Sequence, residues 1–166
     1  METKARAIAL QLEAFFIAPL IASVARSIEP LATKNANKVA IHCHTAIGIL
    51  HGDQMRLRQA LLNVMFNANK VTDRGIITAD ARQARESGRD WVTIAVTDTG
   101  PGMTAKQMGD LLFQEGGTGF GLWISKRFCQ MMGGDLTFES EPGRGSTFTI
   151  RVPRIADAAT KRAAIN

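Results

Sequence analysis

Apolar residues recur every three or four positions over residues 17–34 and again over residues 53–71. This spacing places them on one face of a helix, and Asp53 stands where a helix N-cap is expected. Pro30 lies inside the first segment, where a proline kinks or ends a helix. Two amphipathic helices are therefore predicted, the first of them bent or stopped near Pro30. The apolar side of the second helix is assigned to Met55, Leu57, Leu61, Leu62, Val64, Met65 and Ala68.

Alternating apolar and polar residues predict strands at 75–83 and 90–98, with residues 84–89 as the loop of a hairpin. Alternation of this kind gives a strand one buried face and one exposed face. The remaining strands are expected at residues 8–16 and 37–43 and, on either side of a turn at 142–145, within 135–153.

Two further helices are expected, one over residues 104–113 with Thr104 as its cap and one over 120–134 that ends at glycines. Helices and strands alternate irregularly along the chain, with hairpins among them. This order favours an α/β fold, a two-layer sandwich in which a mixed sheet carries helices on one face. The length suits one domain, which we assign to residues 1–153, and residues 154–166 are expected to form a flexible C-terminal tail.

The composition narrows the class of protein. No apolar run approaches the roughly 18 residues that a membrane-spanning helix needs, and the first residues lack the pattern of a secretory signal peptide. Cys43 and Cys129 stand far apart without metal-binding or redox spacing, which predicts two buried thiols in a reducing cytoplasm. The net charge of +5 fits either a polyanionic partner or a mildly basic surface.

The start of the helix expected at 120–134 is rich in glycine, with Gly116, Gly117, Gly119 and Gly121. Glycine lets backbone N–H groups approach an anion, and a helix N-terminus adds positive charge. The segment is not a P-loop, because no Gly-Lys-Ser/Thr triplet follows. It is not a dinucleotide-binding loop, because Leu122 occupies a required glycine position. It is either a phosphate-binding turn of another kind or a glycine helix stop followed by a new helix.

Asp98 stands at the end of a predicted strand and is followed by Gly100 and Gly102. A carboxylate at this place can accept a hydrogen bond from an exocyclic amine such as that of adenine. The two glycines would let a flat ring lie against the backbone. An ordinary Asx turn explains the same residues without any ligand.

Asn63, Asn67 and Lys70 are spaced four and three residues apart, so they share one face of the predicted helix. Amide oxygens are hard ligands that suit Mg²⁺, and a lysine suits a phosphate group. A solvated helix face is the simpler explanation of these three residues when the segment is taken alone.

Taken together, these segments resemble the ATP-binding catalytic domain of sensor histidine kinases, within the larger group that includes gyrase, Hsp90 and MutL. Residues 56–75 look like the N box of that family, and residues 98–103 look like its G1 box. Residues 111–113 are similar to a remnant of the F box, and 116–126 are similar to the G2 box. The four segments follow the family's order, and the resemblance covers about residues 10–153. It implies the two-layer sandwich known as the Bergerat ATP-binding fold.

The resemblance also implies roles for particular residues. Asn67 would coordinate a Mg²⁺ ion that bridges the ATP phosphates, with Asn63 assisting, and Lys70 would contact phosphate. Asp98 would bind the adenine amine. The other residues expected to bind ATP are Gly100, Gly102 and Met103 beside the base, Gly117, Thr118, Gly119, Gly121 and Leu122 around the phosphate-facing turn, and Thr147 near adenine.

The activity implied is transfer of the γ-phosphoryl group of ATP to a histidine on a separate helical dimerisation domain, upstream in the same protein or in another one. The catalytic domain itself positions groups and stabilises charge. A response regulator is the further partner implied, a nucleic acid is not expected, and the implied location is the cytoplasm. Relatives that hydrolyse ATP tend to carry glutamate at the position of Asn63. An amide cannot take a proton, which favours a kinase over a hydrolase.

The sequence departs from the family in two places. None of His42, His44 and His51 is followed by the pattern expected of a phosphoaccepting histidine. His42 and His44 share a strand face, where they are either a metal-binding pair or ordinary exposed or packed histidines. Only three residues separate Phe113 from Gly117, where the family has a long mobile lid. Two other interpretations therefore stay open: a degenerate domain that acts as a docking or regulatory module, and an ATP-hydrolysing relative of the MutL type.

Overall fold

The computed structural model describes residues 9–44, 47–113 and 120–156. Within these residues the centre is a five-stranded sheet in the order β2-β4-β5-β7-β6, with β2 and β4 parallel and the other neighbours antiparallel. Its strands are β2 (Lys38–Cys43), β4 (Ile76–Glu86), β5 (Arg89–Asp98), β6 (Asp135–Glu141) and β7 (Gly145–Pro153). The helices are α1 (Ile17–Lys34), α2 (Gln54–Val71), α3 (Ala105–Phe113) and α4 (Phe120–Met131).

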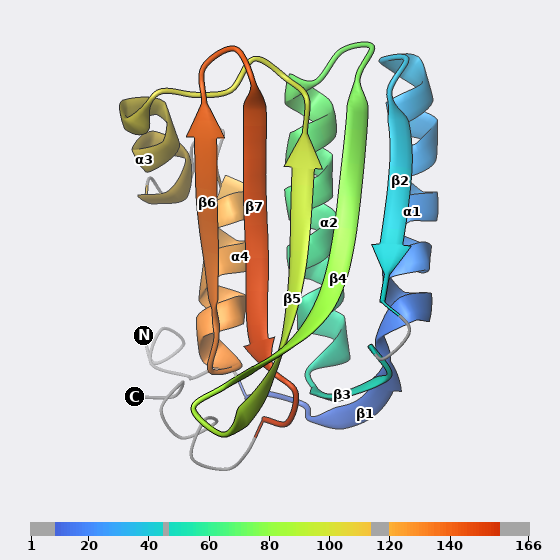
Figure 1. Cartoon of the computed structure of the whole chain (residues 1–166), viewed down its shortest axis with the longest axis vertical. Coiled ribbons are helices and arrows are strands. Elements are labelled where there is room, and N and C mark those ends of the chain that lie inside the picture. The colour runs from blue at the N-terminus through green and yellow to red at the C-terminus, as the bar shows by residue number, and fades with distance from the viewer. Residues whose placement is uncertain (1–8, 45–46, 114–119, 157–166) are drawn as a thin grey trace, which may run out of the picture.

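Helices α1, α2 and α4 lie on one side of the sheet, behind it in Figure 1. The two-layer α/β sandwich predicted from the sequence is therefore confirmed. Strand alternation builds the core between the layers, because every second residue of β5 and β7 turns toward the helices. These core residues are at most 2% exposed and comprise Val92, Ile94, Val96, Phe148, Ile150 and Val152.

Helix α1 continues through Pro30 to Lys34, so the proline does not end it. A proline inside a helix costs about 3 kcal/mol. Here Ile28 and Ala32, on either side of Pro30, are only 1% and 2% exposed. Burial of these apolar side chains against the sheet offsets the missing backbone hydrogen bond, and the exposed Pro30 ring points away from the core.

Helix α2 begins as expected, with Asp53 Oδ1 accepting a hydrogen bond from the backbone N–H of Arg56 at 3.0 Å. The assignment of Met55 to its apolar side is wrong, because this side chain is 75% exposed. Met55 lies in the first turn of α2, before the part of the helix that packs against the sheet. The fully buried apolar residues of α2 are Leu57, Ala60, Leu61, Val64, Met65 and Ala68.

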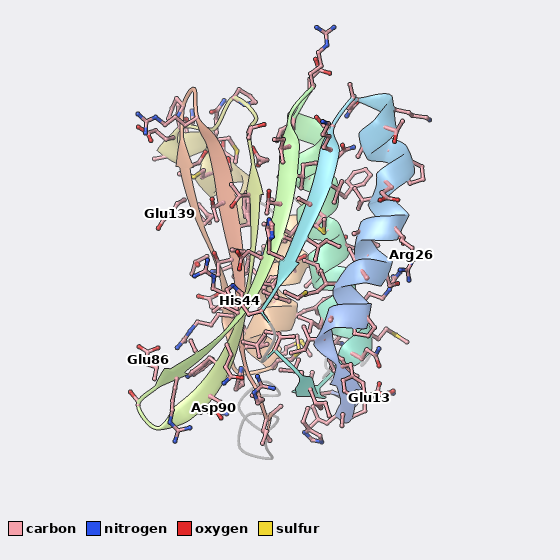
Figure 2. All side chains as sticks on the ribbon, turned by 45° about the vertical axis from the view of Figure 1, so that its right-hand side comes forward. Glu13, Arg26, His44, Glu86, Asp90 and Glu139 are labelled. Carbon is pink, nitrogen blue, oxygen red and sulfur yellow. The ribbon has the colours of Figure 1, made fainter. Side chains whose placement is uncertain are left out.

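The hairpin of β4 and β5 is longer than predicted, and the loop expected at 84–89 is wrong. The strands stay paired as far as Glu86 and Arg89, so Ser87 and Gly88 alone form the turn. Both have positive φ angles, of 54° and 76°, which suit a two-residue turn between twisted strands. In Figure 2 the labelled Glu86 and Asp90 mark this projecting end of the hairpin.

A second, two-stranded sheet pairs β1 (Glu13–Phe16) with β3 (Ile49–Gly52). The strand expected at 8–16 is thus shorter in the structure, and β3 was not predicted. The chain after β7 joins this sheet, since His51 donates to the carbonyl oxygen of Arg154 at 2.8 Å and Ala156 donates to that of His51 at 3.0 Å. Packing continues past the expected domain end to Ala156, and the rest of the expected tail lies outside the described residues.

The short helices follow the predicted signals. Thr104 and Gln107 form a reciprocal capping box, with distances of 2.9 and 3.2 Å, at the start of α3. Helix α4 ends at Met131, where Gly133 takes a φ of 90°. None of the described helices is long and apolar enough to cross a membrane.

The prediction of two buried thiols holds for Cys129 and is wrong for Cys43. Cys129 is fully buried in α4, and burial raises the pKa of its thiol to about 12. Cys43 ends β2, the edge strand of the sheet that the structure describes, and is only partly buried. Both are free thiols, and neither has the low pKa of a reactive cysteine.

Candidate nucleotide site

The three polar residues of α2 come together at one cavity. Asn63, Asn67 and Lys70 face the start of α4, and the cavity between the two helices measures about 230 Å³. Helical spacing alone placed these residues on one face, and the structure adds the opposite wall. The cavity is lined by Asn63, Phe66, Asn67, Lys70, Gly121 and Leu122.

Asn67 has an unpaired amide at this cavity. Its side chain is 9% exposed, and Nδ2 has no hydrogen-bond partner within the described residues. A buried polar atom without a partner costs about 1–3 kcal/mol, so the site is suited to a ligand that supplies one. The exposed side chain of Lys70, one turn further along α2, provides positive charge at the same cavity.

Asn63 lines the same cavity but has both ends of its amide engaged. Its Oδ1 accepts a hydrogen bond from Gln59 at 2.9 Å, and its Nδ2 donates to the carbonyl oxygen of Gly121 at 3.1 Å. A Cβ at Gly121 would lie 3.3 Å from Asn63 Cγ, tighter than ordinary contact. Asn63 therefore ties α2 to α4, and its Oδ1 keeps one lone pair besides the one that accepts from Gln59.

Asp98 ends β5, in the interior of the sheet. It is 2% exposed; its Oδ1 accepts a hydrogen bond from Gly100 at 2.9 Å, while Oδ2 has no partner within the described residues. Burial raises the pKa of the Asp98 carboxyl, although the backbone N–H groups of Gly100 and Ser146 act to lower it. The result is a buried carboxylate oxygen that is open to a hydrogen-bond donor.

Gly100 and Gly102 are both required by close backbone contacts. A Cβ at Gly100 would lie 2.7 Å from the carbonyl oxygen of Val71, the last residue of α2. A Cβ at Gly102, which has a φ of 74°, would lie 2.1 Å from the carbonyl oxygen of Glu141. The glycines thus hold the loop after Asp98 against α2 on one side and the β6–β7 hairpin on the other.

The sequence model of one family, described as "Histidine kinase-, DNA gyrase B-, and HSP90-like ATPase", matches residues 52–156. The chain belongs to this family. It is 43% identical over 115 residues to the sensor histidine kinase RcsC of Escherichia coli K12, a match that covers 63% of this chain and 12% of RcsC. The chain therefore spans a small part of the length of that relative.

Solved structures of histidine kinases share the fold. Full-length ShkA in complex with AMPPNP has a TM-score of 0.79 and 32% sequence identity, covering 95% of this chain and 34% of ShkA. The catalytic domain of ThkA in a nucleotide-free form has a TM-score of 0.78 at 21% identity, covering 88% of this chain and 97% of that domain. The ThkA likeness supports the fold alone.

Thr147, expected near adenine, lies on the other face of this ATPase-family sheet from Asp98. Its Oγ1 is 3.1 Å from Thr97 Oγ1, beside a shallow polar hollow that Glu139 also lines. Ser146 is the residue of β7 that lies opposite Asp98. Thr147 is thus one residue along β7 from the residue opposite Asp98, although Asp98 also lines the hollow, and its place near adenine stays a prediction.

Two hydroxyl residues near Asp98 were missed in the sequence. Thr72 directly follows α2, and its buried Oγ1 has no partner within the described residues; a Cβ at Gly100 would lie 3.2 Å from it. Ser146 could have been found, because the apolar residues Phe148 and Ile150 follow it at the spacing of the buried face. Thr72 carries no such signal.

The remaining predicted residues differ in their surroundings. Met103 is partly buried and packs at the edge of the core, and Leu122 is 2% exposed at the cavity wall. His42 is exposed and His44 lies 3.5 Å from Asp80, and the described residues hold no group of three ligands suited to a metal ion. The turn residues expected to face phosphate lie outside the described residues: Gly117, Thr118 and Gly119.

Proposed function

We propose that this chain is the ATP-binding catalytic domain of a sensor histidine kinase, which binds Mg-ATP and donates its γ-phosphoryl group to a histidine on a separate dimerisation domain. The observation that carries the proposal is the buried Asp98 carboxylate, with one oxygen open to a donor. The domain is proposed to extend over the described chain to Ala156. Membership of the ATPase family and the resemblance of ShkA, which was solved with AMPPNP, support this function.

Asp98 is proposed to recognise the adenine base. Its free Oδ2 is an acceptor only, and the exocyclic amine of adenine is a donor. Guanine carries a carbonyl oxygen at the corresponding position, which would face the carboxylate with like partial charge. Asp98 therefore predicts a preference for ATP over GTP.

Asn67 and Lys70 are proposed to hold the phosphates. The unpaired Nδ2 of Asn67 is a donor that suits a phosphate oxygen, and Lys70 supplies a point charge for phosphate. The side-chain oxygen of the same Asn67 amide is the hard ligand that would hold Mg²⁺. A bound Mg²⁺ would neutralise charge on the phosphates during transfer. Asn63, also at the cavity, cannot act as a base toward water, which favours transfer over hydrolysis.

The acceptor histidine is proposed to come from a dimerisation domain, in the same protein or in another one. None of the residues that line the cavity is a histidine. A response regulator is proposed as the next partner, in line with ThkA, which has been solved in complex with the response regulator TrrA. A cytoplasmic location, where ATP is available and free thiols persist, completes the proposal.

The proposal is tested by incubating the chain with γ-labelled ATP, Mg²⁺ and a purified histidine-containing dimerisation domain from a related kinase such as RcsC. Label on the histidine, stable to base and labile to acid, is expected, and a His→Ala form of the acceptor domain should remain unlabelled. Steady phosphate release without labelled protein would instead indicate a hydrolase.

A second candidate function is a docking or regulatory module that binds nucleotide without transfer. The three residues between Phe113 and Gly117 favour it, because so short a segment leaves little chain to close over a nucleotide. ATP binding with no label on any supplied acceptor domain would support this function against the kinase.

A further inference from the structure

The loop that follows Asp98, residues 99–104, is held by the end of the β6–β7 hairpin. Figure 1 shows the chain passing the tops of β7 and β6 on its way to α3. Gly143, in the hairpin turn, donates from its backbone N–H to the carbonyl oxygen of Pro101 at 2.7 Å. Together with the tight contact between Gly102 and the backbone of the hairpin, this bond fixes the middle of the loop.

One side chain holds the far end of the loop. Ser140 Oγ accepts a hydrogen bond from the backbone N–H of Met103 at 2.8 Å. The same oxygen lies 2.8 Å from Ser146 Oγ and 3.1 Å from the carbonyl oxygen of Gly145. A hydroxyl has one proton and two lone pairs. All three contacts are therefore satisfied when Ser146 donates to Ser140 and Ser140 donates to Gly145.

The same residues also contact Asp98. Ser146 lies opposite Asp98 in the sheet, and its backbone N–H acts to lower the pKa of the Asp98 carboxyl. Gly145, with a φ of 116°, approaches so closely that a Cβ would lie 2.1 Å from the carbonyl oxygen of Asp98. Ser140 therefore connects Met103, at one side of the proposed base site, with Asp98 at the other.

We propose that Ser140 is a positioning residue for the adenine base, whose hydroxyl holds Met103 at a fixed place relative to Asp98. The inference rests on the proposed function, since it concerns the base of the same nucleotide. Ser140 touches no reacting atom. Its contacts do not include the cavity of Asn67 and Lys70, so loss of its hydroxyl affects recognition of the base and spares the phosphate end.

The test is a calorimetric titration of four proteins with Mg-ATP, Mg-GTP and Mg-tripolyphosphate. The proteins are the wild-type chain, Ser140→Ala, Ser140→Thr and a control on the same strand, Thr137→Ala, which changes an exposed residue. Ser140→Ala leaves the Met103 N–H without its acceptor. The Kd for Mg-ATP should then rise about tenfold, as expected for the loss of a partly buried hydrogen bond.

The pattern across ligands separates positioning of the base from general damage. In Ser140→Ala the preference for ATP over GTP should fall by a similar factor, while the Kd for Mg-tripolyphosphate changes by less than about twofold. Ser140→Thr keeps the hydroxyl and should restore both the affinity and the preference. Thr137→Ala should match the wild type for all three ligands.

If Ser140→Ala binds Mg-ATP with the same Kd and the same preference over Mg-GTP as the wild type, the inference is overturned and the proposed function stands. Equal losses for ATP and tripolyphosphate would overturn it as well. A wild-type chain that binds no ATP removes the proposed function and this inference with it. If Ser140→Ala shows no cooperative thermal transition, Ser140→Cys replaces it, because sulfur keeps the side-chain size but is a much weaker acceptor. A smaller loss of ATP affinity and of ATP preference is then expected, again without loss for Mg-tripolyphosphate, and wild-type values for all three ligands would overturn the inference.

Discussion

At the scale of single residues, three buried polar atoms near the proposed site have no hydrogen-bond partner within the described part of the chain. They are Asp98 Oδ2, Asn67 Nδ2 and Thr72 Oγ1. Each costs folding free energy, about 1–3 kcal/mol, and a ligand that supplies partners would recover it. Residues that serve binding thus lower the stability of the ligand-free protein, and this cost can be measured.

Asp98→Asn should stabilise the ligand-free protein at neutral pH. The amide can still accept the hydrogen bond of Gly100 but removes a buried negative charge. Because burial raises the pKa of Asp98 in the folded state, its contribution to wild-type stability is fully present below about pH 4, the usual aspartate pKa. It is lost as pH rises through the raised pKa.

Urea unfolding of both proteins between about pH 4 and pH 8 measures this effect. The free energy of unfolding of Asp98→Asn should exceed that of the wild type at the upper end, and the difference should shrink toward the lower end. A difference that stays constant with pH would contradict the account of the buried Asp98 carboxyl.

Asn67→Ala should remove the dependence of ATP affinity on Mg²⁺. In the wild type, chelating Mg²⁺ is expected to raise the Kd for ATP about tenfold or more, because the ion links the phosphates to the Asn67 amide. The variant should show one weak Kd with and without the ion. Gln54→Ala, at the other end of α2, is the control and should respond to Mg²⁺ as the wild type does. A full Mg²⁺ response in Asn67→Ala would exclude this residue as the ligand.

At the scale of elements, α2 connects the parts of the site. Its C-terminal half carries Asn67, its last residue is close to Gly100, and its start is fixed by Asp53. Asp53 is 1% exposed; Oδ2 accepts hydrogen bonds from the backbone N–H of Gln11 at 3.0 Å and from the Arg56 guanidinium at 2.9 Å. The same carboxylate therefore caps the helix and ties down the chain that precedes β1.

Asp53→Ala should lower the free energy of unfolding by about 2–4 kcal/mol, because the helix loses its cap and Arg56 loses its charged partner. Urea unfolding measures the loss, with Asp73→Ala as the control, since the Asp73 side chain is 76% exposed. A loss below about 0.5 kcal/mol, the range of ordinary surface substitutions, would show that the cap does not matter to the fold.

Replacing glycine by alanine should have opposite effects on stability at Gly109 and at Gly102. Gly109, inside α3, has no described atom within 4 Å of a built Cβ, so Gly109→Ala should stabilise the protein by about 0.5–1 kcal/mol. Gly102→Ala forces a Cβ onto the Glu141 carbonyl oxygen and should destabilise it. Thermal unfolding of both variants checks the signs. Stabilisation by Gly102→Ala would contradict the packing of the loop against the hairpin.

At the scale of the whole molecule, regular patterns in the sequence predicted most of the fold. The helical spacing of α1 and α2 and the alternation of β5 were visible because each has one buried face. Strand β3 was not, since four residues show no period and their partner β1 lies far away in the chain. The outer part of the β4–β5 hairpin is exposed on both faces, so its polar residues looked like a loop.

The site was predictable in the same uneven way. Asn63, Asn67 and Lys70 share a helix face, which spacing alone reveals. The partners of Asp98 depend on strand register, which places Ser146 opposite Asp98 and Thr147 opposite Thr97. Ser140 and Met103 are 37 residues apart and meet only because the hairpin folds onto the loop, so no local pattern indicates their contact.

The central claim, that Asp98 and α2 form an ATP site, is tested most directly by calorimetric titration of the chain with a non-hydrolysable ATP analogue and Mg²⁺. We predict saturable binding at one site, weakened at least about tenfold in Asp98→Asn, because the base loses a charged hydrogen-bond acceptor. No saturable binding by the wild-type chain, or equal affinity in Asp98→Asn, would contradict the account.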